Sequence, residues 1–212
     1  KLKELLLENG FEKSLSQHRL VSPEGIPIDV VPFGQLEDEE ANIQWPPNGD
    51  IVMNVLGFQE ACDYAEMVRI QDVPSVYIPV ATPKGMTLLK LISWTDRAID
   101  MRKRDAKDLL YLMKTYTKIP AIEGGLYNNG SPMERYGWDM ELAGAHQLGI
   151  DAKAIAGEQT YKTVAALFNE EHKTLSVEKL VEEMCDQIDY EYKKNKEIMD
   201  ALIEGFLQGE KP

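Results

Sequence analysis

The spacing of apolar residues changes at Thr82-Pro83, and this change limits the folds open to the chain. Before it, short runs rich in β-branched residues are typical of strands. After it, apolar residues recur at the i, i+3, i+4, i+7 spacing of helices, and Thr-Pro suits an N-cap and the first helical position. We therefore predict an α/β (α+β) fold, with a mixed first part at residues 1–118 and a helical C-terminal region at 119–212.

The same pattern predicts individual elements, with turn residues between them. An opening helix ends at Asn9-Gly10, and the segment 120–138, rich in Gly, Asn and Pro, is predicted as a long loop. Strands are predicted at 17–22, 25–33, 68–71 and 76–81. Helices are predicted at 58–65, from Thr82 to Arg97, at 104–116, 138–148 and 159–170, and from Ser176 onward, where Lys179 leaves half of a capping box.

The charge balance and the cysteines limit the class of protein. The chain has 36 acidic and 23 basic side chains, a net charge of −13, which repels nucleic acid unless a basic patch or a bound metal overrides it. No apolar run approaches the roughly 20 residues of a membrane span, and no secretory leader is visible. We expect a cytoplasmic protein without a membrane partner, in which Cys62 and Cys185 are reduced, buried thiols; a disulfide between them is the alternative.

Asp29 is a carboxylate within the apolar run Ile26 to Phe33. Burying such a group is costly unless it is paired, hydrogen-bonded or bound to a metal. One interpretation is an edge-strand aspartate that faces water, since alternation places Ile28 and Val30 on the other face. The other is a ligand of Mg²⁺, an ion that favours carboxylates together with substrate phosphates. The acidic residues 38–40 are near in sequence but are expected to be solvated in a loop.

Lys90 and Arg97 lie seven positions apart, so they project from nearly the same side of a helix, with Trp94 between them. One interpretation is two solvent-exposed cations on an amphipathic helix. The other is a surface that holds phosphates and stacks on a base. Asp105 and Asp108, three positions apart near the start of the next helix, complement its dipole or reach back to orient Lys90 or Arg97, and the two roles can coexist.

The histidines and glycines give no further motif. His18, His146 and His172 are dispersed, without the spacing of metal ligands or of a Ser/His/Asp or Cys/His arrangement. His18-Arg19, in the strand before Asp29, offers a weak match to a phosphate contact. No phosphate-cradling glycine loop of the Walker or dinucleotide type is present.

Taken together, several runs resemble the nucleotidyltransferase family of AbiEii/AbiGii-type abortive-infection toxins, which belongs to the polymerase-beta-like nucleotidyltransferase superfamily. The resemblance covers roughly residues 1–118, and its motifs are specific as a set rather than singly. It rests on His18-Arg19-Leu20, Pro27 to Gly34, Ile43 to Pro47, Val55 to Ala61, Leu89 to Arg97 and Arg104 to Leu109.

The resemblance implies a minimal nucleotidyltransferase fold, with a mixed sheet, flanking helices and a helical C-terminal region. It implies Mg²⁺-dependent transfer of a nucleoside monophosphate from an NTP to an acceptor hydroxyl, with RNA, notably tRNA, as the acceptor and a cognate antitoxin as a partner. By this resemblance Asp29 is the catalytic and metal-binding carboxylate, and Lys90 faces the triphosphate. Arg97, Trp94, Asp105 and Asp108 then complete the nucleotide-binding set.

The chain departs from the family at its beginning. Family members carry a Gly-Ser loop and an Asp-x-Asp pair upstream of the opening helix, and neither precedes Lys1 here. We therefore expect a truncated form that is inactive by itself, because one carboxylate cannot form a two-metal clamp. The alternative is a catalytically inactive nucleotide- or RNA-binding module, or a protein-interaction module, of the same fold. A plain α/β scaffold for a partner is the third interpretation, favoured by the net charge of −13.

Overall fold

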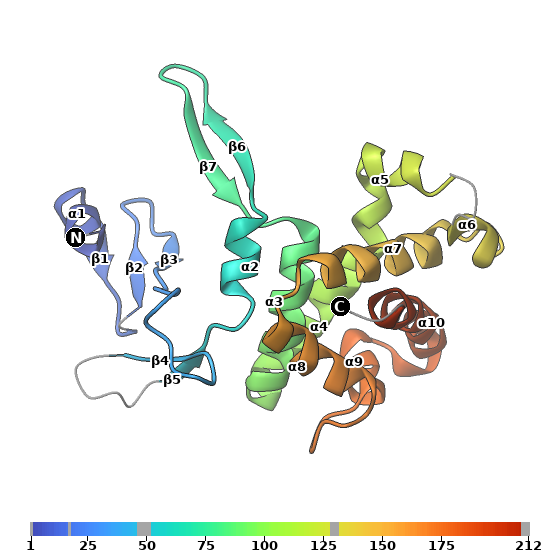
Figure 1. Ribbon diagram of the computed structural model, residues 1–212. Coiled ribbons are helices and arrows are strands. Elements are labelled where there is room, and N and C mark those ends of the chain that lie inside the picture. Colours follow the sequence, from blue (N-terminus) through green and yellow to red (C-terminus); the bar gives the residue numbers. More distant parts are fainter. Residues whose placement is uncertain (1, 17, 46–51, 128–131, 209–212) are drawn as a thin grey trace. The chain divides into compact units, whose positions relative to one another are not determined.

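The computed structural model describes residues 2–16, 18–45, 52–127 and 132–208 (Figure 1). The chain divides into two compact units, Lys1–Val55 and Leu56–Pro212. The described strands form small antiparallel sheets, one within β1–β3, one of β4 with β5 and one of β6 with β7, and helices make up most of the rest. The predicted mixed α+β class is confirmed at this level.

The first unit contains a short helix and two small sheets. The strand order in the larger sheet is β1-β2-β3, so β3 lies at an edge. The second and third strands are shorter than the predicted strands at 17–22 and 25–33. Gln17 lies outside the described residues. The elements are α1 (Leu2–Glu8), β1 (Glu12–Lys13), β2 (Arg19–Val21), β3 (Pro27–Asp29), β4 (Asn42–Gln44) and β5 (Val52–Asn54).

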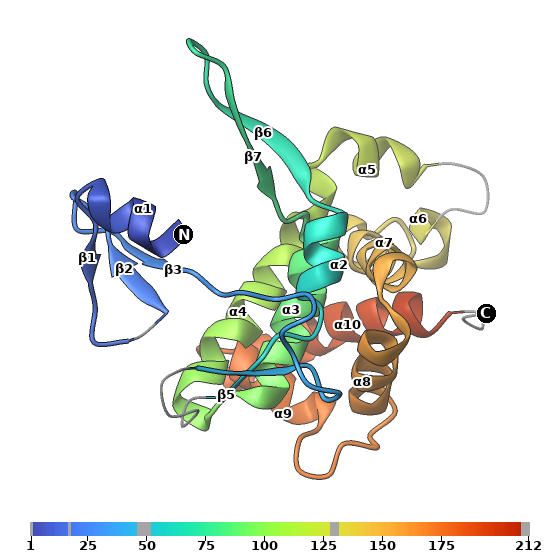
Figure 2. The same cartoon turned by 60° about the vertical axis from the view of Figure 1, so that its left-hand side comes forward.

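The second unit begins with a helix and a hairpin and continues as helices. The hairpin strands match the predicted ones, and in both Figure 1 and Figure 2 the hairpin projects away from the helices of this unit. Every residue of both strands is exposed. The first elements are α2 (Phe58–Asp63), β6 (Glu66–Gln71), β7 (Val76–Val80), α3 (Pro83–Asp96) and α4 (Ile99–Thr115).

The remaining helices differ from prediction mainly at their ends. The segment 120–138 is not one long loop, because it contains two short helices, and its residues 128–131 lie outside the described part. The helix predicted at 138–148 continues to Ile155, and the first of the Ser176 helices begins where its cap predicted. The elements are the 3₁₀ turn η1 (Tyr116–Lys118), α5 (Pro120–Gly125), α6 (Pro132–Arg135), α7 (Met140–Ile155), α8 (Glu158–Phe168), α9 (Val177–Met184) and α10 (Ile188–Leu207).

One hydrophobic core joins the helices of the second unit. The predicted boundary at residue 118 differs from the observed division after Val55, because α3 and α4 bury their apolar faces against later helices rather than against a sheet. Burying these faces together removes the apolar surface of all six helices from water. The core includes Leu91 and Trp94 of α3, Leu109 and Met113 of α4, Leu148 of α7, Leu167 of α8, Leu180 of α9, and Ile198 and Phe206 of α10.

Two glycines allow α7 and α10 to approach closely. A Cβ atom at Gly205 would lie 2.0 Å from the carbonyl oxygen of His146. A Cβ atom at Gly149 would lie 2.2 Å from the carbonyl oxygen of Leu202. At each place the opposing atom is backbone, which cannot rotate away, so only glycine fits this crossing.

A buried ion pair links α4 to α9. The guanidinium of Arg102 donates to the carboxylate of Glu183 through Nε at 3.1 Å and through Nη2 at 2.8 Å. Trp94 Nε1 of α3 donates to the same carboxylate at 2.8 Å, and the guanidinium carbon of Arg102 lies 5.4 Å from the centre of the Trp94 ring. Both charged side chains are only 10% exposed. Their charges are therefore compensated inside the unit rather than by water.

Side chains cap two of the later helices. The carboxylate of Glu60, on α2, accepts hydrogen bonds from the backbone N–H of Gly157 and from the hydroxyl of Thr160 at the start of α8. The hydroxyl of Ser176 accepts from the backbone N–H of Lys179, which confirms the predicted N-cap of α9. The contacts with Gly157 and Lys179 each satisfy a backbone N–H that a helix start leaves without a partner in the helix.

Both cysteines are free thiols, so the disulfide alternative is wrong. Cys185 is buried, as predicted, whereas Cys62 is exposed because α2 turns Ala61 and not Cys62 toward the interior. Among the described helices, none combines the length and the apolar character that a membrane crossing demands.

Candidate functional site

Four side chains form an ion cluster between α3 and its successor, which we call the α3–α4 ion cluster. Lys90 of α3 and Arg97, which follows its last turn, supply the cations, and Asp105 and Asp108 of α4 supply the carboxylates. Lys90 Nζ lies 3.0 Å from Asp105 Oδ1 and 2.6 Å from Asp108 Oδ2. Arg97 Nη1 lies 2.9 Å from Asp105 Oδ2. Each oxygen of Asp105 thus holds a different cation.

Burial decides which members of this cluster are fixed. The Asp105 side chain is 1% exposed, that of Lys90 is 19% exposed and that of Arg97 is 43% exposed. Burial acts to lower the pKa of Lys90, but the hydrogen bonds to Asp108 and Asp105 outweigh it and raise that pKa above its usual value. The cluster therefore presents a permanent ammonium and a guanidinium, anchored by a buried carboxylate.

The cluster distinguishes the two interpretations of the aspartates. Helix α4 begins at Ile99, five residues before the predicted start at 104, so Asp105 and Asp108 lie beyond its first turn. The dipole effect falls off within that turn, and Asp100 occupies it instead. The dipole role therefore does not account for the two aspartates. Their contacts with Lys90, and that of Asp105 with Arg97, match the other interpretation.

Trp94 does not share the exposed face of Lys90 and Arg97. Its side chain is fully buried, with the ring between Arg102 and the core and Nε1 bound to Glu183. Stacking of Trp94 on a base is therefore wrong for this structure, because neither face of the indole is open. Lysine and arginine reach the surface from nearby positions because their long apolar stems carry the charge outward.

Asp29 is the last residue of β3 and lies opposite Arg19 of β2 in the sheet register. Arg19 Nε donates to Asp29 Oδ1 at 2.7 Å and Nη2 to Oδ2 at 2.8 Å. These hydrogen bonds lower the pKa of Asp29, with burial acting against them. The side chain is 41% exposed and β3 is an exposed edge strand, so the edge-strand interpretation describes the surroundings of Asp29.

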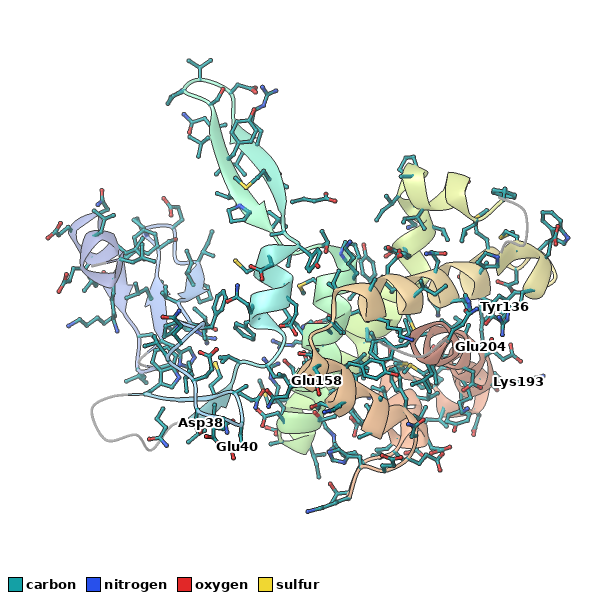
Figure 3. The ribbon with its side chains drawn as sticks, in the orientation of Figure 1. Asp38, Glu40, Tyr136, Glu158, Lys193 and Glu204 are labelled. Carbon is teal, nitrogen blue, oxygen red and sulfur yellow. The ribbon has the colours of Figure 1, made fainter. Side chains whose placement is uncertain are left out.

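The described residues do not by themselves form a magnesium site. Both oxygens of Asp29 are engaged by Arg19, and His18 Nε2, 3.9 Å from Oδ1, adds no carboxylate. Within the described ranges, no group of three or more His, Cys, Asp or Glu side chains is placed to hold a metal ion. Asp38 accepts from the backbone N–H of Glu40 and of Asn42, so it closes a turn (Figure 3).

The first unit also contains a pocket of about 630 Å³, which sequence reasoning missed. Its residues come from separate short elements, and no spacing rule connects them along the chain. His18 and Trp45 were each part of a motif, but their rings meet only in the folded unit, with centroids 5.5 Å apart.

His146 is a buried histidine of α7 with both ring nitrogens engaged. Nδ1 lies 3.0 Å from the hydroxyl of Tyr136, and Nε2 lies 3.0 Å from the side-chain oxygen of Gln208. The Tyr136 hydroxyl also donates to Glu204 of α10, the two residues labelled together in Figure 3. Burial lowers the pKa of His146, with Arg135 acting in the same direction. The ring therefore links α7 to Tyr136 and to Gln208 at the end of α10, and this structural role explains the buried histidine.

Comparisons with protein-family models, with curated proteins and with solved structures found no match to this chain. The fold and the site define a mixed α+β protein that carries a paired-cation cluster between two helices. The resemblance to the AbiEii-type nucleotidyltransferases therefore stays a prediction from the sequence.

Proposed function

We propose that this protein is a nucleotidyltransferase, and that it moves a nucleoside monophosphate from an NTP to a hydroxyl of RNA, tRNA being the first acceptor to test. The observation that carries the proposal is the α3–α4 ion cluster. Four of the residues named by the resemblance, Lys90, Arg97, Asp105 and Asp108, lie in direct contact although 15 positions separate Lys90 from Asp105. A cytoplasmic toxin with a cognate antitoxin is the setting that the resemblance supplies for this activity.

In this proposal Lys90 and Arg97 bind the triphosphate. Ammonium and guanidinium groups donate short, charge-assisted hydrogen bonds to phosphate oxygens. Asp105 holds both cations in place before the ligand arrives, which reduces the entropy lost on binding. Among the described residues, only Asp105 bonds the Arg97 guanidinium, through Nη1, so its other donors are open to a ligand.

Mg²⁺ enters the proposal through the resemblance alone. The carboxylates of the described residues do not assemble a site for it, and we derive no step through the metal. Its involvement is an experimental variable: labelling of RNA by the full-length protein is compared with Mg²⁺ and with a chelator.

Lys90→Ala is expected to weaken NTP binding by about ten- to a hundredfold, because a hydrogen bond to a charged group is lost. The measurement is calorimetric titration of each NTP. Lys84→Ala is the matched control, since Lys84 lies on the same helix but over the ring of Tyr64 instead of in the cluster. Equal affinities of the Lys90 variant and the unchanged protein would remove the phosphate role.

Asp29→Asn is expected to abolish incorporation of labelled nucleotide into total RNA by the full-length protein, while thermal melting stays close to that of the unchanged protein. The reason is the catalytic carboxylate role that the resemblance implies. Asp72→Asn, an exposed aspartate paired only with Arg69 in the described residues, is the control. Unchanged labelling by the Asp29 variant takes this residue out of the site.

A non-catalytic module that binds a nucleotide or RNA is the second candidate. The pairing of Asp29 with Arg19 favours it, because a carboxylate bound on both oxygens is not poised to receive a metal. Saturable NTP binding without any labelling of RNA, by the full-length protein with Mg²⁺ present, is the result that selects this candidate over the enzyme.

A further inference from the structure

The pocket of the first unit has the composition of a site for a small organic molecule. Its volume of about 630 Å³ lies within the range of such sites, and its walls are mostly apolar with a few polar groups among them. The apolar walls are Leu20, Val30, Pro32, Leu36 and Ile43, and the remaining lining residues are Lys3, His18, Gln44 and Trp45.

Two aromatic rings give the pocket a preference for a flat ligand. The rings of His18 and Trp45 lie 5.5 Å apart and are tilted by 44°, so they are neighbours that do not stack fully on each other. Faces of this kind pack well against a third planar ring. Stacking on aromatic side chains is also the common way in which proteins hold single bases.

Two polar atoms of the same rings lack partners among the described residues. His18 Nδ1 and Trp45 Nε1 are buried and make no hydrogen bond with any described residue. Buried polar atoms in folded proteins are nearly always paired, and an exception points to a water or a ligand that completes the site. The indole nitrogen offers a donor, and the imidazole nitrogen accepts or donates according to its tautomer.

We propose that this pocket binds a heteroaromatic base, and the choice of a nucleobase rests on the proposed function. An aliphatic ligand would pack against the apolar walls but would leave both ring nitrogens without a hydrogen-bond partner. A bare phosphate could pair with Lys3, but it would place the rest of its charge against apolar walls such as Leu20 and Ile43. A base has flat apolar faces, which pack against the apolar walls, and an edge of donors and acceptors, which can pair with the two ring nitrogens.

The test is calorimetric titration of the full-length protein with adenosine, guanosine, cytidine and uridine, and with inorganic tripolyphosphate. At least one nucleoside is expected to bind. Leu36→Trp fills the pocket from a side chain that is 68% exposed, and is expected to weaken nucleoside binding by about tenfold or more. Leu15→Trp is the matched control, because Leu15 is fully exposed in the same unit and does not line the pocket; its nucleoside affinity is expected to stay unchanged.

A second pair of variants keeps the test decisive if the larger side chain disturbs folding. Trp45→Phe retains an aromatic wall and removes the N–H donor, and it is expected to weaken nucleoside binding by about three- to tenfold. Trp138→Phe, at an exposed tryptophan of the second unit, is its control. Tripolyphosphate binding is expected to be the same in all four variants.

Absence of nucleoside binding, or equal nucleoside affinity in Leu36→Trp, Leu15→Trp and Trp45→Phe, overturns the pocket proposal. This failure is distinct from failure of the proposed function. If RNA is labelled but the pocket variants leave nucleoside binding unchanged, only the pocket proposal fails. If the pocket variants weaken nucleoside binding but RNA is not labelled, only the transferase proposal fails.

Discussion

Glu183→Ala is expected to lower the free energy of unfolding by about 3–5 kcal/mol, because it leaves the Arg102 guanidinium buried without its counter-ion. It also removes the acceptor of the Trp94 indole N–H in the core of the second unit. The measurement is urea unfolding at pH 7. Glu182→Ala is the matched control, since Glu182 is the preceding residue of α9 and pairs at the surface with Lys179, at 3.1 Å. Glu182→Ala is expected to lower the free energy of unfolding by no more than about 1 kcal/mol.

The pH dependence gives an independent check on this pair. Burial acts to raise the pKa of Glu183, but the hydrogen bonds from Arg102 and Trp94 outweigh it, so the pKa is lowered in the folded state. A lowered pKa stabilises the fold above the unfolded value of about 4.3, and this stabilisation is lost as the pH falls through the folded value. The difference in free energy of unfolding between the unchanged protein and Glu183→Ala is thus expected to become smaller below about pH 4. The ion-pair argument is contradicted if this difference in free energy of unfolding stays constant from pH 7 to pH 3. It is also contradicted if the difference is no larger than the one caused by Glu182→Ala.

Gly205→Ala is expected to destabilise the second unit by about 3 kcal/mol, at the upper end of the usual cost of overpacking. The added methyl group meets the carbonyl oxygen of His146, and α7 and α10 must move apart to admit it. This separation of the two helices also loosens the contacts of the Phe206 ring with the rings of Tyr161 and Phe168. Thermal melting followed by circular dichroism measures the loss.

Gly124→Ala is the control for this substitution. Gly124 is also helical, in α5, and an added Cβ there meets nothing within 4 Å. It is expected to raise stability by roughly 0.5–1 kcal/mol, because alanine loses less backbone entropy in a helix than glycine does. Equal effects of the two substitutions are incompatible with a close approach of α7 and α10.

Local chemistry in the sequence predicted the starts of several elements well. Thr82-Pro83 precedes α3, Ser176 caps α9, and the break at 72–75 separates the strands of the hairpin. These signals act within a few residues, where backbone conformation and capping are decided. The start of α4 was predicted late, because Ile99 to Lys103 carries no apolar face with helical spacing.

The partners of the site residues depend on tertiary packing, and the sequence predicted them only in part. Helical spacing placed Lys90, Trp94 and Arg97 on one side of α3, but it does not state how deep each side chain lies. Packing against α9 buries the indole, while Asp105 turns the two cations toward α4. The neighbours of Asp29 were likewise set by strand register, which brings Arg19 opposite it.

The carboxylate of Glu60 has a consequence for how the second unit opens. It belongs to the first helix of that unit, yet it holds the beginning of α8, with 97 positions between Glu60 and Gly157. Fraying of either helix exposes the same hydrogen bonds, so amide protons near both ends should exchange with solvent together. Segments distant in the chain are thus coupled through one carboxylate, and opening of α2 is expected to release the start of α8 as well.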